Sequence, residues 1–150
     1  MNYLKKIEDF KPSFFWYLSA FLFFFVSRLF IIKYLDIDST SVYSDIQRYL
    51  TYSDQILRGN FNLAVDFFIP APLHYYILAL FKLIFYENWI NPYLLFQLTL
   101  LSTSSIYIYK LSELIFEKGI VAILSWLIYF FYLPTSWFVA YFLQENNFQC

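Results

Sequence analysis

Charged residues are scarce in this chain. Asp, Glu, Lys and Arg make up 14% of its 150 residues, against about 25% in an average soluble domain. Hydrophobic residues make up 61% and aromatic residues 26%, with 20 Phe and 15 Tyr. This composition excludes an ordinary soluble domain and indicates an integral membrane protein.

Cysteine, glycine and clustered positive charge are also nearly absent. The single cysteine is the last residue, Cys150, so the sequence offers neither a disulfide framework nor a cysteine metal cluster. Only two glycines are present, and no internal repeat is visible. The net charge of −1 and the lack of a basic run argue against nucleic acid as a partner.

The first long apolar segment covers residues 14–35. At about 1.5 Å per residue it is long enough for the roughly 30 Å hydrocarbon core of a bilayer. It is preceded by three lysines: Lys5, Lys6 and Lys11. We expect an uncleaved signal anchor with residues 1–13 in the cytoplasm. Arg28 inside this segment either extends toward the outer interface, together with Lys33, or has a functional role.

An outer loop over residues 36–91 follows, and its first part predicts a helix over 44–58. Ser44 and Gln47 have the spacing of a capping box, and Gly59 is placed as a helix stop. One face of this helix is expected to carry Ile46, Tyr49, Leu50, Ile56 and Leu57. Another is expected to carry Asp45, Arg48, Tyr52 and Gln55. The pattern predicts an amphipathic helix that lies on the bilayer surface.

A second short helix of this loop is predicted over residues 73–86. It is too short to span comfortably, since 14 residues of helix cover about 21 Å, and Lys82 interrupts it. Such a segment is typical of an interfacial or re-entrant helix, and Pro70 and Pro72 mark its start. His74, the only histidine, is either an anchor at headgroup level or a catalytic group.

Two further spans are predicted over residues 92–109 and 120–142. The link between them, 110–119, contains two lysines, which favours a cytoplasmic position. Residues 143–150 then emerge on the outer side. If the short helix spanned instead, the link would turn outward. The predicted fold class is an all-α integral membrane protein with about three transmembrane helices and two interfacial amphipathic helices in the first outer loop.

This topology places two acidic residues, Asp45 and Glu145, at the outer surface. Carboxylates there can bind a divalent cation, take a proton from a hydroxyl group or hold a sugar by hydrogen bonds. Each residue also has a purely structural interpretation. Asp45 stabilises the N-terminus of its helix, and Glu145 is a solvated loop acid.

The signal anchor is followed in order by five stretches: "SDIQRYLTYSDQILRGN", "APLHYYILALFKLIF", "LLFQLTLLSTSSIYIYKLSELIF", "GIVAILSWLIYFFYLP" and "ENNF". This order, over most of residues 14–148, resembles the N-terminal part of membrane glycosyltransferases of the GT-C class. Relatives of that class include protein mannosyltransferases and bacterial lipid A aminoarabinose transferases. The basic-Pro-Pro-Leu step of the family is only partly kept here, since its place is taken by Pro70, Ala71, Pro72 and Leu73.

The resemblance implies roles for the two acidic residues. Asp45 corresponds to the catalytic acid-base residue of the family, and Tyr49 to the tyrosine that often follows it. Glu145 corresponds to a second acid that lines the acceptor or metal region. A divalent metal held by Asp45 and Glu145 is one option for a cofactor.

The resemblance also implies contacts with the donor. An Arg late in the first span is common in the family, as Arg28 is here. Arg28, Lys33 or Arg48 could bind the donor phosphate by charge-assisted hydrogen bonds. His74 or Asp66 could compensate for the basic residue of the family, whose place is taken by Pro70.

The implied activity is transfer of a sugar, with inversion, from a polyprenyl-phosphate donor to a lipid, glycan or protein acceptor. The implied location is the outer face of a bacterial inner (plasma) membrane. Members of the class are several times longer, so these 150 residues are expected to be part of a longer protein and inactive alone. Two alternatives are a non-catalytic membrane protein, such as a transporter or assembly subunit, and a lipid-linked polysaccharide polymerase or ligase. A transporter should place ionisable groups near mid-membrane, where the spans have only Arg28.

Overall fold

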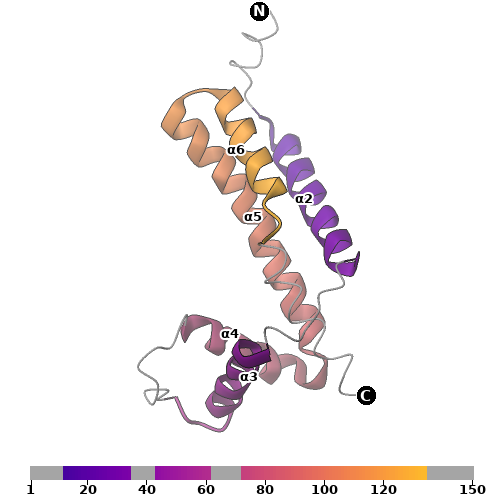
Figure 1. Cartoon of the computed structure of the whole chain (residues 1–150), viewed down its shortest axis with the longest axis vertical. Coiled ribbons are helices and arrows are strands. Elements are labelled where there is room, and N and C mark those ends of the chain that lie inside the picture. Colours follow the sequence, from indigo (N-terminus) through magenta and orange to yellow (C-terminus); the bar gives the residue numbers. More distant parts are fainter. Residues whose placement is uncertain (1–11, 35–42, 62–71, 135–150) are drawn as a thin grey trace, which may run out of the picture. The chain divides into compact units, whose positions relative to one another are not determined.

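A computed structural model describes residues 12–34, 43–61 and 72–134. All regular structure in these ranges is helical (Figure 1). The α-helices are α2 (Phe14–Tyr34), α3 (Tyr43–Leu57), α4 (Pro72–Phe85), α5 (Ile90–Phe116) and α6 (Gly119–Phe131), and the 3-10 helix η2 (Tyr86–Asn88) lies between α4 and α5. The predicted all-helical class is therefore confirmed for the described part of the chain.

The first three helices, α2, α3 and α4, agree with the predicted ranges to within one residue at either end. The later helices differ. α5 continues to Phe116 through most of the predicted link, because neither Gly nor Pro occurs between Pro92 in its first turn and Gly119. It ends where Glu117 adopts a left-handed φ of 52°.

The last described helix, α6, ends at Phe131, before the predicted limit of 142. Pro134 explains this end, since proline lacks the N–H that would bond to the carbonyl of residue 130. The remainder of the predicted span and Glu145 lie outside the described residues. Only α2 is long and apolar enough to cross a membrane, with 19 suitable residues over Phe14–Ile32, among the helices of the described ranges.

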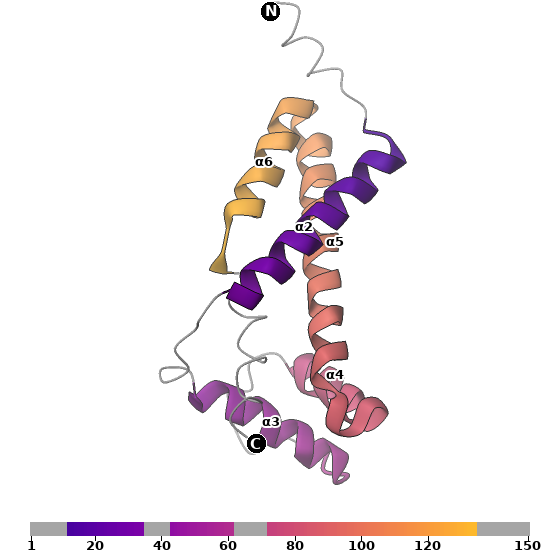
Figure 2. The ribbon, with the colours of Figure 1, turned by 90° about the vertical axis from the view of Figure 1, so that its right-hand side faces the viewer.

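The chain divides into two compact units. Among the described residues, unit 1 contains α2, α6 and the part of α5 from Gln97 onward. In Figure 2 α2 runs beside α5 and α6. Aromatic rings join these helices: the ring centroid of Trp16 on α2 lies 4.7 Å from that of Tyr109 on α5 and 6.5 Å from that of Trp126 on α6. Large exposed apolar side chains cover the remainder of α2, among them Leu22, Phe23, Val26 and Phe30.

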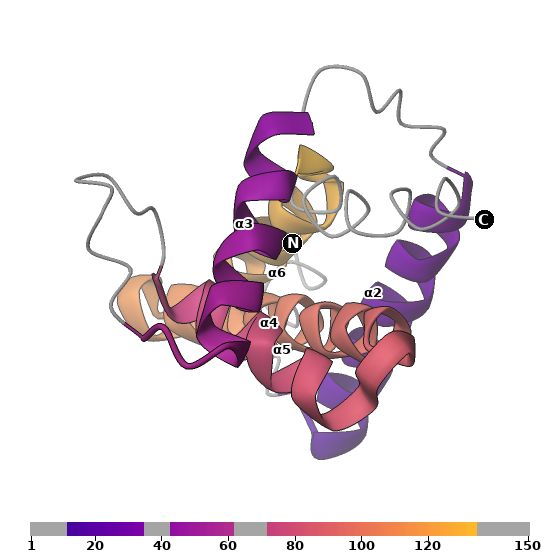
Figure 3. The same ribbon diagram turned by 90° about the horizontal axis from the view of Figure 1, so that it is seen from below.

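Unit 2 contains α3, α4, η2 and the start of α5. Its core is the interface where α3 packs across α4 (Figure 3), with Tyr52 and Ile56 of α3 buried against Tyr75 and Ala79 of α4. Tyr49, Leu50 and Ile56 of the predicted apolar face are thus partly or fully covered by protein, while Leu57 stays exposed. Contact of α3 with the bilayer stays a prediction. Tyr52 was predicted on the polar face, but it is buried. The part of α3 that α4 covers is wider than the face defined by its aliphatic residues.

A glycine ends α3 as the sequence predicts. Gly59 has a φ of 86°, a left-handed conformation that glycine adopts without strain. Its N–H donates to the carbonyl of Ile56 at 3.0 Å, and the N–H of Asn60 donates to the carbonyl of Gln55 at 3.0 Å. These two bonds form a Schellman motif. The capping box stays a prediction, because the side chains of Ser44 and Gln47 lie outside the described part.

Candidate functional site

Packing of α3 on α4 brings candidate site residues together in unit 2. The rings of Tyr49 on α3 and His74 on α4 meet edge to face, with centroids 4.9 Å apart. Asp45 lies four residues before Tyr49 in the first turn of α3. Positions i and i+4 are neighbours on a helix, about 40° apart around its axis. Position 45 therefore lies beside the face that carries Tyr49, although the sequence assigned the two residues to different faces. Two of the residues predicted for the site, Tyr49 and His74, therefore meet between these two helices.

A tyrosine that the sequence did not single out completes this group. The hydroxyl of Tyr93, at the start of α5, lies 3.0 Å from Nε2 of His74 and 3.2 Å from Nδ1. Tyr93 is buried, and burial also lowers the pKa of His74 from its ordinary value of 6.5. His74 is therefore neutral at pH 7. A neutral imidazole accepts a hydrogen bond at one nitrogen and donates one at the other, as recognition of a hydroxyl-rich ligand requires.

Acidification is expected to destabilise the folded protein through His74. Because the folded state has the lower pKa, the unfolded state binds more protons below pH 6.5. The stability contribution is complete above that pH and is lost as the pH falls through the lowered pKa. Thermal unfolding in detergent, measured between about pH 7.5 and 5.5, should show this loss. His74→Gln, which stays neutral, should flatten the slope, and an unchanged slope would contradict a buried neutral His74, the only histidine of the chain.

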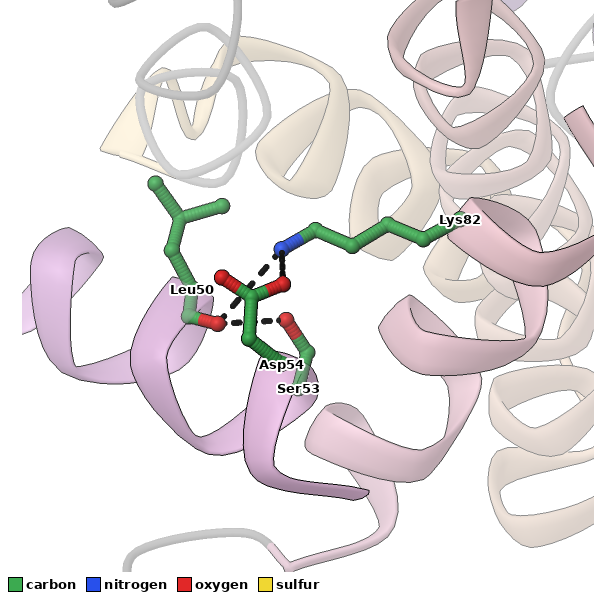
Figure 4. A network of polar contacts seen from close by, with 4 residues as sticks. All are labelled: Leu50, Ser53, Asp54 and Lys82. Atoms are coloured by element: carbon green, nitrogen blue, oxygen red, sulfur yellow. Dashed lines mark hydrogen bonds and ion pairs between the residues drawn. The ribbon is translucent and has the colours of Figure 1, made fainter. Parts of the chain in front are cut away.

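An ion pair also joins the two helices (Figure 4). Nζ of Lys82 on α4 lies 2.7 Å from Oδ1 of Asp54 on α3 and 3.4 Å from the carbonyl oxygen of Leu50. The same carbonyl accepts a bond from the hydroxyl of Ser53 at 2.7 Å. The ammonium group also lies 5.4 Å from the ring centroid of Trp89. The Lys82 side chain is only 12% exposed, so its charge is directed into the helix pair.

The two arginines predicted to bind the donor phosphate, Arg28 and Arg48, lie in different units. Arg48 is exposed on α3, as expected for a residue on its polar face. Arg28 belongs to unit 1, where it is completely buried instead of extended toward solvent. Its Nη2 donates to the carbonyl oxygens of Phe130 and, at 3.3 Å, Tyr129, and its guanidinium carbon lies 4.8 Å from the ring centroid of Phe24. Arg28 thus joins α2 to α6 by hydrogen bonds.

Several predicted site features fall outside the described part of the chain. Glu145 and Asp66 lie there entirely, as do the side chains of Lys33 and Asp45. The described side chains contain no group of three or more His, Cys, Asp or Glu that could hold a metal ion. Metal binding at Asp45 and Glu145 therefore stays a prediction.

Comparison with known proteins does not place the chain in a family. No protein-family model matches it, and neither a curated protein nor a solved structure does.

Proposed function

We propose that this chain belongs to a membrane glycosyltransferase that transfers a sugar from a polyprenyl-phosphate donor to a lipid, glycan or protein acceptor at the outer face of the membrane. The observation that carries the proposal is the packing of α3, with Asp45 in its first turn, against the His74 region of α4. A rigid helix pair can hold a catalytic carboxylate in a fixed position, as general-base chemistry requires.

The chemistry needs one base and several hydrogen-bonding groups. Asp45 would take the proton from an acceptor hydroxyl group while the hydroxyl oxygen forms a bond to the anomeric carbon. The bond from that carbon to the donor phosphate breaks with its electron pair on the phosphate oxygen, which inverts the configuration. The helix N-terminus favours the ionised form of Asp45 that this step uses. Tyr49 and His74, next to each other, can bind hydroxyl groups of the sugar.

A membrane location supports a lipid-linked donor. α2 has the length and the apolar surface to cross a bilayer, and the helix pair of unit 2 follows it closely in the chain. The proposed arrangement has three spans over 14–35, 92–109 and 120–142, with the outer loop between the first two. Sugar transfer measured with and without the Asp45 carboxylate tests the proposed activity, and transfer that does not depend on Asp45 would contradict it.

The topology has its own test by cysteine labelling in a Cys150→Ser background. Glu117→Cys, in the exposed turn between α5 and α6, should resist an impermeant thiol reagent in intact cells and react after permeabilisation. Glu117 suits this test because acidic residues contribute little to orientation. Asn147→Cys should react in intact cells. The opposite labelling of the two positions would overturn the three-span arrangement.

A further inference from the structure

One side of α4 is apolar and exposed. We call Leu73, Leu80 and Ile84 the α4 outer surface; their side chains are 70%, 51% and 56% exposed. At about 100° per residue, Leu80 lies about 140° around the helix axis from Tyr75, which is buried against α3. The α4 outer surface therefore points away from α3. Leu83 and Tyr76, which are also exposed, flank it.

The only Lys, Arg, Asp or Glu of α4 does not interrupt this surface. Lys82 lies on the α3 side, where it pairs with Asp54 and contacts Leu50. From the sequence, the positive charge of Lys82 argued against an apolar environment for residues 73–86. The ion pair with Asp54 neutralises that charge. Its partner Asp54 lies on α3, which is the more polar of the two helices. The two helices thus form two layers, one apolar outside and the other polar outside.

We propose that α4 lies in the plane of the bilayer, with the α4 outer surface at the boundary between headgroups and acyl chains, and that α3 rests on its water side. The sequence predicted both helices of this loop on the lipid surface. In the structure α4 keeps an exposed apolar surface, whereas most of the described apolar residues of α3 pack against protein. The inference rests on the membrane location in the proposed function.

Three observations favour lipid over a second protein as the occupant. Eight residues, 35–42, separate α2 from α3, so the helix pair follows the proposed span closely in the chain. Trp89 and Tyr86, just after α4, are residue types that concentrate at the headgroup level. Lys82, the charged residue of α4, is turned toward α3, so no charged side chain of α4 borders the α4 outer surface as part of the polar rim that surrounds a protein interface.

This arrangement defines how the two substrates approach the site. Packed helices have axes about 8–10 Å apart, so α3 would hold Asp45 one layer above the helix that touches lipid. A donor phosphate at headgroup depth would meet the helix pair from the membrane. The acceptor hydroxyl would come from the water side, where Arg48 and Thr51 of α3 and Arg58, just after it, are exposed.

Depth-dependent fluorescence quenching tests the inference on the whole chain. The protein, in a Cys150→Ser background, is placed in vesicles of phosphatidylcholine and phosphatidylglycerol that carry nitroxide quenchers at a shallow or a deep acyl position. Single variants Leu73→Cys, Leu80→Cys and Ile84→Cys are labelled with an environment-sensitive dye. Thr51→Cys on α3 and Arg58→Cys just after it are the matched controls for unit 2, and Phe23→Cys on α2 reports on the proposed span.

The three α4 labels should be quenched by the shallow nitroxide and at one common depth, while the α3 labels respond only to an aqueous quencher. A spanning α4 would instead separate Leu73 and Ile84 by about 16 Å in depth. That result, or α4 labels that only aqueous quenchers reach while Phe23→Cys is quenched deeply, would overturn the inference and leave the membrane location intact. A Phe23→Cys label that no lipid quencher reaches would overturn the membrane location itself.

Discussion

Asp45→Asn is expected to abolish sugar transfer and to leave insertion and thermal stability almost unchanged. Loss of a general base typically lowers the rate by about 10²- to 10⁴-fold. Asn keeps the size and the hydrogen-bonding oxygen of Asp, so the lost interaction with the N-terminus of α3 costs only about 0.3 to 1 kcal/mol. The measurement is the initial rate of transfer from a polyprenyl-phosphate donor by the protein in its native membrane, normalised to the inserted amount.

The control for this variant must be an acid of the same unit that does not support the helix pair. Asp54 is unsuitable, because its carboxylate holds Lys82 and its loss would disturb the packing of α4 on α3. Glu87→Gln in the exposed helix η2 should transfer at the wild-type rate. If Asp45→Asn also transfers at that rate, or loses activity only because it fails to insert, Asp45 is a helix-stabilising residue and the glycosyltransferase proposal loses its base.

Local sequence signals were sufficient for the helices up to Phe85. A continuous apolar run defined α2, amphipathic spacing defined α3, and Gly59 marked the end of α3 through a left-handed conformation that few other residues adopt. The limits of α5 and α6 were less predictable. The lysines near 110–119 indicated a link, but lysine and glutamate are good helix formers, so α5 continues through them.

The contacts of the candidate site could not be predicted, because they join residues distant in sequence. Lys82 and Asp54 are 28 positions apart, and the ion pair depends on how α3 crosses α4. In the sequence, Lys82 argued against a membrane-spanning position for residues 73–86. In the structure, its ammonium group forms an ion pair between α4 and α3. Tyr93 was missed for the same reason, since its relation to His74 arises only when α5 returns to α4.

The structure likewise gives Arg28 a bonding partner that its sequence position does not reveal. α6 ends at Phe131, and the last carbonyl groups of a helix have no partner within it. Pro134 removes the N–H that would serve the carbonyl of Phe130. Nη2 of Arg28 donates to that carbonyl and to the carbonyl of Tyr129. A residue of α2 thus caps the end of α6, where a positive charge also favours the helix dipole.

Arg28→Met is therefore expected to lower the free energy of unfolding by about 3 kcal/mol, the upper range for hydrogen bonds to a charged group. Met keeps much of the volume of the buried stem, so the loss reports mainly on the missing cap. The check is thermal and chemical unfolding in detergent, with Val26→Met as the control on an exposed side of α2. Arg28→Lys should recover part of the stability, because an ammonium group can reach one carbonyl without the fork of a guanidinium.

The same variant separates a structural role from the donor contact that the sequence suggested for Arg28. A guanidinium that caps α6 is needed for folding, and its loss should reduce transfer only in proportion to the folded fraction. If Arg28→Met instead unfolds like the wild type and transfers sugar poorly, with a raised KM for the donor, the cap is dispensable and Arg28 binds phosphate. The full burial of Arg28 favours the first outcome, because a phosphate could reach the guanidinium only after α2 and α6 had separated.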